Sequence, residues 1–182
     1  MIWNNEVLYL HVPKTAGISV TAYLLDNLRG PVSYTAPSQN RSLKRGRYFE
    51  GNRHETLYDA ESFFTYRNRS IFDFDMIVAV MRDPYDLEVS RYHYLRKGNK
   101  VDRGPAQDLA MAGDYGAYMA EASFFGADPP RLDRYLHIAG VMPDNLRVIR
   151  FEHLADDFER LLGPYLRRGA DPSLPRLNES KH

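Results

Sequence analysis

Two segments decide the fold of this chain: Val7-Leu-Tyr-Leu-His-Val-Pro-Lys-Thr-Ala-Gly-Ile-Ser19 and Met76-Ile-Val-Ala-Val-Met-Arg-Asp-Pro-Tyr-Asp-Leu-Glu-Val-Ser-Arg-Tyr92. Each begins with an apolar run that predicts a strand, and each continues through a polar turn into a helix. The backbone N–H groups of such a turn, together with the positive end of the helix dipole, can bind an anion. Lys14 lies in the first turn, and Arg82 and Ser90 follow the second strand. Two anion sites at adjacent strand ends indicate one ligand with two separated anionic groups.

The rest of the chain continues this alternation of strands and helices. Strands are predicted at residues 7–12, 75–81 and 146–151. Helices are predicted at 19–28, 59–66, 84–95, 107–112, 115–124, 131–138 and 154–162, with loops at 30–46 and 98–106. This order is typical of a three-layer α/β domain, in which helices flank a central parallel sheet and the crossovers are right-handed. Ligands of such sheets bind beyond the carboxyl ends of the strands, where both turns lie.

Length and composition are those of an ordinary globular chain. With 182 residues, 43% hydrophobic and 26% charged, the chain can bury a core and is expected to form a single domain over 1–182. Its 24 Lys and Arg residues equal its 24 Asp and Glu residues, so no overall field favours nucleic acid or a membrane surface as a partner. The absence of cysteine excludes disulfides and thiolate metal sites. No apolar run has the length of a membrane-spanning helix, and residues 1–6 lack a signal-peptide pattern, so a cytoplasmic protein is expected.

Each turn has a plain structural alternative. In the first, Gly17 permits a close backbone approach or a positive φ, and Ser19 can cap the helix and contact a ligand oxygen, but the turn could also be an ordinary one with an exposed lysine. It is not the phosphate loop of ATPases, because G-x-x-x-x-G-K-[ST] is absent. In the second, the planar fork of Arg82 suits phosphate oxygens, but Arg82 could instead pair with Asp83 or Asp86.

These two segments resemble a known family. Residues 11–19 are similar to the 5′-phosphosulfate-binding loop of sulfotransferases that use 3′-phosphoadenosine 5′-phosphosulfate (PAPS), and residues 82–92 are similar to their 3′-phosphate-binding segment, R-x-P-x-x-R-x-x-S-x-Y. Residues 148–154, with Asp157 and Phe158, resemble a later strand and helix of the family, and residues 174–180 resemble a tail motif of its carbohydrate-type branch. The resemblance implies the sulfotransferase fold, which is like that of P-loop nucleotide hydrolases.

The chain departs from the family pattern at two places. The usual arginine five residues after the first is Leu87, followed by Glu88, so one supporting cation is missing unless Arg91 or Arg96 replaces it. The sequence also stops at His182, where relatives commonly continue through another helical segment. We therefore expect either a short natural form or a domain that lacks a C-terminal extension.

The resemblance also implies an activity and its site residues. A sulfuryl group would pass from PAPS to a hydroxyl or amine of an acceptor, leaving adenosine 3′,5′-bisphosphate (PAP), without any metal. Lys14 would stabilise charge on the leaving oxygen, as donors in an oxyanion hole do. The donor would be bound by Lys14, Thr15, Ala16, Gly17, Ile18, Ser19, Arg82 and Ser90.

A general base is sought between the two motifs. His54 is the first candidate, because related enzymes often place a catalytic histidine or glutamate there and imidazole accepts a proton near neutral pH. Glu50 and Glu55 are the reserve candidates. His11 and His93 are interpreted as structural residues.

The acceptor and the reaction class have alternatives. The basic stretch 41–53 could attract an acidic glycan, although it could equally be a solvated loop, and a small metabolite is the other acceptor class considered. An ATP-dependent small-molecule kinase of related fold is the first alternative function, with Asp83 holding Mg²⁺. A non-catalytic nucleotide-binding module is the second, and Leu87 favours it.

Overall fold

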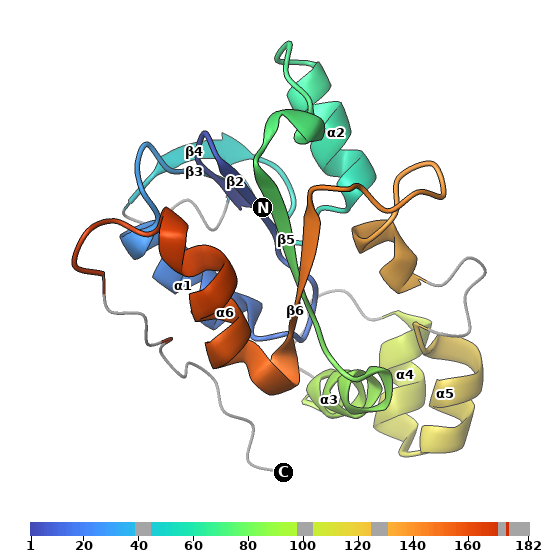
Figure 1. The fold of residues 1–182 in the computed structure, drawn as a ribbon. Coiled ribbons are helices and arrows are strands. Elements are labelled where there is room, and N and C mark those ends of the chain that lie inside the picture. The colour runs from blue at the N-terminus through green and yellow to red at the C-terminus, as the bar shows by residue number, and fades with distance from the viewer. Residues whose placement is uncertain (39–44, 98–103, 125–130, 171–173, 175–182) are drawn as a thin grey trace.

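The computed structural model describes residues 1–38, 45–97, 104–124, 131–170 and 174, and its centre is a sheet of six strands flanked by helices (Figure 1). The strands lie in the order β4-β3-β1-β2-β5-β6. Their bounds are β1 Ile2–Trp3, β2 Val7–Leu10, β3 Ser33–Ala36, β4 Arg47–Glu50, β5 Met76–Met81 and β6 Leu146–Arg150. The α/β class is confirmed, and so are the three predicted strands, which correspond to β2, β5 and β6.

The sheet is mixed, so the prediction of a purely parallel sheet is wrong. β1 pairs antiparallel with both β2 and β3, whereas β2–β5, β5–β6 and β3–β4 are parallel pairs. Asn4 makes the reversal after β1, because its side-chain oxygen accepts hydrogen bonds from the backbone N–H groups of Glu6 and Val7. β2 and β3 both oppose β1, so they run in the same direction as each other. The carboxyl ends of β2 to β6 therefore lie at one edge of the sheet, which we call the carboxyl edge.

Three strands were not predicted, and one of them falls in a predicted loop. β3 lies within the segment 30–46 that was expected to be a loop, and residues 39–44 of that segment are outside the described residues. β1 has only two residues, and β3 (SYTA) and β4 (RYFE) lack the continuous apolar run that made β2 (VLYL) recognisable. They are strands because their neighbours provide hydrogen bonds and packing, which is the context on which strand preference depends.

The helices are close to their predicted positions. They are α1 Gly17–Asn27, α2 Leu57–Thr65, α3 Pro84–Arg96, α4 Pro105–Ala112, α5 Tyr115–Ala122 and α6 Leu154–Leu162. The helix predicted at 131–138 is instead a short 3₁₀ turn, Arg131–Tyr135. The loop predicted at 98–106 ends earlier, because Pro105 begins α4, while its residues 98–103 are outside the described residues. Among the described residues, no helix is both long and apolar enough to cross a membrane.

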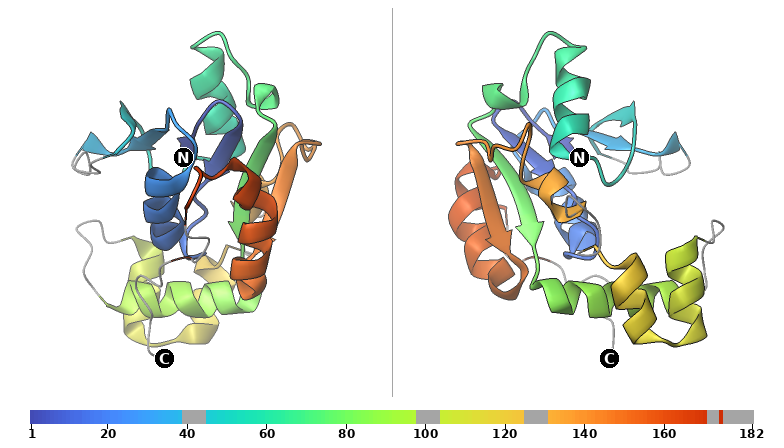
Figure 2. Two further views of the ribbon diagram at one scale, coloured as in Figure 1. Left: turned by 60° about the vertical axis from the view of Figure 1, so that its left-hand side comes forward. Right: turned by 90° about the vertical axis from the view of Figure 1, so that its right-hand side faces the viewer.

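Two cores lie on the two faces of the sheet. Along β2, Leu8 and Leu10 pack into the core that α2 covers, and Val7 and Tyr9 pack into the core that α1 and α6 cover. This alternation is what the two-residue period of a strand produces. β5 is likewise covered on both faces, as its continuous apolar run predicts. A third cluster joins α3, α4 and α5, which lie together beyond the carboxyl edge (Figures 1 and 2).

Candidate functional site

The two turns that are predicted to bind anions lie side by side at the carboxyl edge. β2 and β5 are parallel neighbours, and Leu10 near the end of β2 pairs with Ala79 near the end of β5. The turn after β2 contains Lys14, and Arg82 directly follows β5. Neighbouring parallel strands therefore bring together two segments that are far apart in sequence, as the alternating pattern predicted.

The first turn leaves the start of α1 without a side-chain cap. Lys14 and Ala16 both have positive φ, 65° and 60°, a conformation that non-glycine residues rarely adopt. The fully buried Thr15 holds the turn by donating from its hydroxyl to the carbonyl oxygen of Val12, at 2.9 Å. Ala16 occupies the N-cap position of α1 and can offer no side-chain acceptor to the first N–H groups of the helix. Uncapped N–H groups at the positive end of an 11-residue helix are suitable donors for an anion.

Gly17 is required by the close approach of a side chain. A Cβ atom added at Gly17 would lie 1.7 Å from Nε2 of His11, so it would overlap the edge of the imidazole ring. Positive φ is not the reason, because the described glycines with positive φ are Gly46, Gly113, Gly140 and Gly169, and Gly17 is not one of them. Of the two reasons expected for this glycine, close approach is therefore the correct one, and the approaching group is the His11 ring.

The second turn differs, because carboxylates already occupy its N–H groups. The Asp83 side chain caps α3 by accepting from the backbone N–H groups of Tyr85 and Asp86, and Glu152 accepts from the N–H group of Asp83 at 2.7 Å. Pro84 has no N–H group. The expectation that both turns offer backbone donors is thus wrong for the second turn. Only side chains, those of Arg82 and Ser90, can bind an anion there.

Arg82 has hydrogen-bonding capacity that the protein does not use. Its side chain is 18% exposed, and its buried Nε has no hydrogen-bond partner among the described residues. The guanidinium carbon lies 4.5 Å from the ring centroid of Phe151, and the nearest carboxylate oxygen, from Asp86, is 4.0 Å away. The pairing with Asp86 that was considered as an alternative is present but long, and Asp83 is occupied as the helix cap. A buried N–H group without a partner in the protein is rare, so this group of Arg82 is suited to donate to an anion.

A contact joins the first turn to the helix that follows the second. Nζ of Lys14 lies 4.3 Å from the ring centroid of Tyr94 on α3. Tyr94 is four residues after Ser90, so the two side chains lie on the same face of α3. Ser90 is buried, and Lys14 and Tyr94 are more accessible. No sequence pattern predicted the contact of Tyr94 with Lys14, because it depends on where α3 packs against the first turn.

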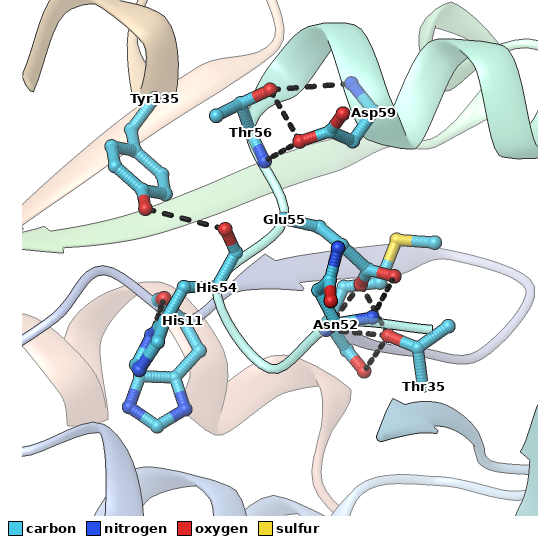
Figure 3. Close-up of polar contacts among 9 residues, drawn as sticks. His11, Thr35, Asn52, His54, Glu55, Thr56, Asp59 and Tyr135 are labelled. Carbon is cyan, nitrogen blue, oxygen red and sulfur yellow. Dashed lines mark hydrogen bonds and ion pairs between the residues drawn. The ribbon is translucent and has the colours of Figure 1, made fainter. Parts of the chain in front are cut away.

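His54 is held beside the first turn by hydrogen bonds at both of its ends (Figure 3). Its Nδ1 lies 2.9 Å from the carbonyl oxygen of His11, and its own carbonyl oxygen accepts from the hydroxyl of Tyr135 at 3.3 Å. A carbonyl oxygen can only accept, so Nδ1 of His54 carries the proton and Nε2 is the basic nitrogen. The rings of His11 and His54 meet edge to face, with centroids 4.6 Å apart.

His11 itself stays neutral. Burial lowers its pKa to about 3, with smaller electrostatic contributions from the neighbouring His54, N-terminal amino group and Arg53. The ring is 6% exposed and packs against Gly17. The uncharged His11 ring therefore packs between the first turn and His54.

The two reserve bases lie in different surroundings. Glu55 is buried, and its carboxylate accepts hydrogen bonds from the Thr35 hydroxyl, from the amino group of Met1 and from the N–H group of Asn52 (Figure 3). This carboxylate joins β1, β3 and the loop after β4. Glu50 is exposed at the end of β4, an outer strand of the sheet. His54 is thus the one of the three candidates that contacts a residue of the first segment, through His11.

The departure at Leu87 has a structural explanation. Leu87 is fully buried in the core that contains Leu8 and Leu10, so its side chain faces the sheet. Arg91 does not replace the missing cation, because its guanidinium donates to the Tyr118 hydroxyl and the carbonyl oxygen of Ala122. Glu88, with 0% exposure, completes this contact between α3 and α5 by accepting from the Tyr118 hydroxyl at 2.6 Å and from the Phe124 N–H group. For Arg96, the other possible replacement, the guanidinium carbon lies 5.6 Å from the ring centroid of Tyr92.

Two further expectations fall partly outside the described residues. In the basic stretch 41–53, a guanidinium nitrogen of Arg45 lies 3.5 Å from a carboxylate oxygen of Asp26, and the Arg47 guanidinium lies over the Phe49 ring. Arg53 is exposed, and Arg41 and Lys44 lie outside the described residues. The tail motif at 174–180 is described only at Leu174, which packs against the core that α1 and α6 cover. In the described part of the chain, no group of three or more His, Asp and Glu side chains could hold a metal ion.

Comparison of the chain with family models, with curated proteins and with solved structures found no match. We therefore infer the function from the residues of the site and from the motifs that resemble those of the sulfotransferases.

Proposed function

We propose that this protein is a PAPS-dependent sulfotransferase with the P-loop-like fold of that family. The observation that carries the proposal is the pair of unlike anion sites at one edge of the sheet. One site has uncapped helix N–H groups and Lys14, and the other has the unpartnered Nε of Arg82, with the buried Ser90 further along α3. PAPS has two separated anionic groups, a 5′-phosphosulfate and a 3′-phosphate, and so needs two such sites. The order of the two motifs along the chain supports the same assignment.

The proposed reaction is an in-line displacement at sulfur. An acceptor oxygen or nitrogen attacks the sulfur atom, and the bond between sulfur and the 5′-phosphate oxygen breaks, so that PAP leaves. Lys14 stabilises the negative charge that develops on that leaving oxygen, and the N–H groups of residues 15–19 hold the 5′-phosphosulfate. Arg82 and Ser90 bind the 3′-phosphate, which fixes the position of the donor. Because this chemistry is mainly positioning and electrostatics, it needs no metal ion from the protein.

The proposed base is His54. Since its Nδ1 donates to the carbonyl oxygen of His11, the lone pair of Nε2 is the one that accepts the acceptor's proton. The neutral His11 adds no competing positive charge beside it. The exposed Arg47 and Arg53, which flank the loop leading to His54, suit an acidic glycan, and a small metabolite is the other acceptor class.

A calorimetric comparison of PAP, ATP and AMP tests the proposal first. We expect PAP to bind most tightly, because it alone of the three has both a 5′-phosphate and a 3′-phosphate. Arg82→Ala should weaken PAP binding about 10- to 100-fold, the loss expected for one or more hydrogen bonds to a charged group. Lys14→Ala should weaken PAP binding less, but should lower turnover from labelled PAPS by about 100-fold or more, as removal of an oxyanion donor does.

A matched control is Arg29→Ala, which removes an exposed arginine that pairs with Glu6 away from the carboxyl edge. It should leave PAP affinity and turnover unchanged. Preferential binding of ATP with Mg²⁺-dependent phosphate transfer would favour the kinase alternative. Tight PAP binding without turnover over a broad acceptor panel would favour the non-catalytic module. Near-normal turnover of Lys14→Ala at saturating PAPS would contradict the role given to Lys14.

A further inference from the structure

The contact between Lys14 and Tyr94 gives α3 a second role in the site. Nζ of Lys14 is 4.3 Å from the centroid of the Tyr94 ring, within the range in which an ammonium group is attracted to the face of an aromatic ring. Lys14 belongs to the turn after β2, whereas Tyr94 belongs to the helix after β5. The contact therefore spans the two anion sites.

A contact with a fixed aromatic ring restricts the positions that the Lys14 ammonium group can take. A lysine side chain has four rotatable bonds, and fixing them costs conformational entropy. Lys14 starts from a backbone with φ of 65°, so its side chain leaves the turn in a direction that most residues do not take. The Tyr94 ring lies where that side chain ends, on the face of α3 that also carries Ser90.

We propose that Tyr94 is a positioning residue for Lys14, holding the ammonium group between the two anion sites before the donor binds. This inference depends on the proposed function, because it concerns the lysine to which we assign the leaving group. The face of the aromatic ring attracts the ammonium group. Phenylalanine at position 94 should therefore position Lys14 as tyrosine does, whereas an aliphatic residue should not. Tyr94 is 44% exposed, so its substitution removes little packing.

The kinetic test compares Tyr94→Leu, Tyr94→Phe and the wild type. Tyr94→Leu should lower kcat about two- to fivefold, the factor that corresponds to an exposed cation–π contact, with little change in KM for PAPS or in PAP affinity. Tyr94→Phe should restore kcat to near the wild-type value. The control is Tyr66→Leu, which removes an 84% exposed tyrosine at the end of α2 and should change neither parameter. Unchanged kcat in Tyr94→Leu would overturn the inference, as would weaker PAP binding with kcat unchanged, since Tyr94 would then act on the donor directly.

A spectroscopic test needs no turnover. In protein with ¹³C-labelled lysine, the ε-methylene signal of Lys14, assigned with Lys14→Arg, should be displaced by the ring current of Tyr94. The displacement should disappear in Tyr94→Leu and persist in Tyr94→Phe. A Lys14 signal like that of an exposed lysine in the wild type would overturn the inference even if a variant failed to fold. Failure of the wild type to bind PAP would instead refute the proposed function, while the signal would still report whether the contact exists.

Discussion

Lowering the pH should destabilise this protein through one buried side chain, His11. Burial lowers the pKa of His11 to about 3 in the folded protein, whereas a histidine in an unfolded chain titrates near a pKa of about 6.5. Between these two values the unfolded chain binds a proton at His11 that the folded protein excludes. The unfolded state is therefore stabilised relative to the folded state as the pH falls, and the free energy of unfolding decreases.

The size of the effect follows from the two pKa values. Each pH unit within the window lowers the free energy of unfolding by about 1.4 kcal/mol. Between pH 7.5 and pH 4.5, His11 alone should lower the free energy of unfolding by about 2.5 kcal/mol. The decrease begins only below about pH 6.5, where the unfolded chain starts to bind the proton. This is a substantial part of the 5–15 kcal/mol that typically stabilises a domain.

The assay is urea unfolding at several pH values, with the wild type compared with His11→Gln. Glutamine keeps a polar side chain but cannot take up a proton in this range. Below about pH 6.5 the free energy of unfolding should fall more steeply for the wild type than for the variant. His54 and the carboxylates are present in both proteins, so their titration largely cancels in the difference. His93→Gln, at an exposed position of α3, should retain the steep wild-type slope. Parallel pH profiles for the wild type and His11→Gln would refute the argument.

Two further predictions concern packing around the same turns. Gly17→Ala should destabilise the fold by about 1–3 kcal/mol because its methyl group would overlap the His11 ring, and adding His11→Ala should recover much of that loss in urea unfolding of the double variant. A Gly17→Ala protein as stable as the wild type would show that the ring does not occupy that space. Leu87→Arg would recreate the arginine of the family pattern. It should lower the free energy of unfolding by about 3–5 kcal/mol, because it places an uncompensated charge in the core. A stably folded Leu87→Arg protein with improved PAP binding would contradict this.

The sequence predicted the parts of the fold that have strong apolar patterns. β5 is six residues long and almost entirely apolar, and β2 and β6 are short runs that lead into clear turns. The same reasoning could not find β1, which has two residues, or place it antiparallel between β2 and β3. A strand of that length exists because its neighbours bind it on both sides, and this information is not local.

The sequence predicted where the residues of the candidate site lie, but not which hydrogen bonds they make. Lys14 and Arg82 were expected at adjacent strand ends, and the parallel pairing of β2 with β5 brings them there. The backbone conformation decides which residue takes the N-cap position of each helix. Asp83 takes it in α3 and caps the helix, whereas Ala16 takes it in α1 and leaves the helix uncapped. The contact of Lys14 with Tyr94 and that of His54 with His11 depend on how separate loops pack, which no local pattern encodes.

The difference between the two turns limits where a second anion can bind. At the start of α3, the carboxylates of Asp83 and Glu152 take up the backbone donors and add negative charge, so a phosphate at the helix terminus would be repelled. We therefore expect the second anion of the proposed donor to bind to one side, where Arg82 has an unsatisfied Nε and Ser90 lies two turns along the helix. The start of α1 has no acidic residue in its first turn and no side-chain cap, so there an anion can bind directly to the helix terminus. A ligand that satisfies both turns must present one anion to backbone N–H groups and the other to an arginine, which is why we favour a donor with two chemically distinct anionic ends over a simple triphosphate.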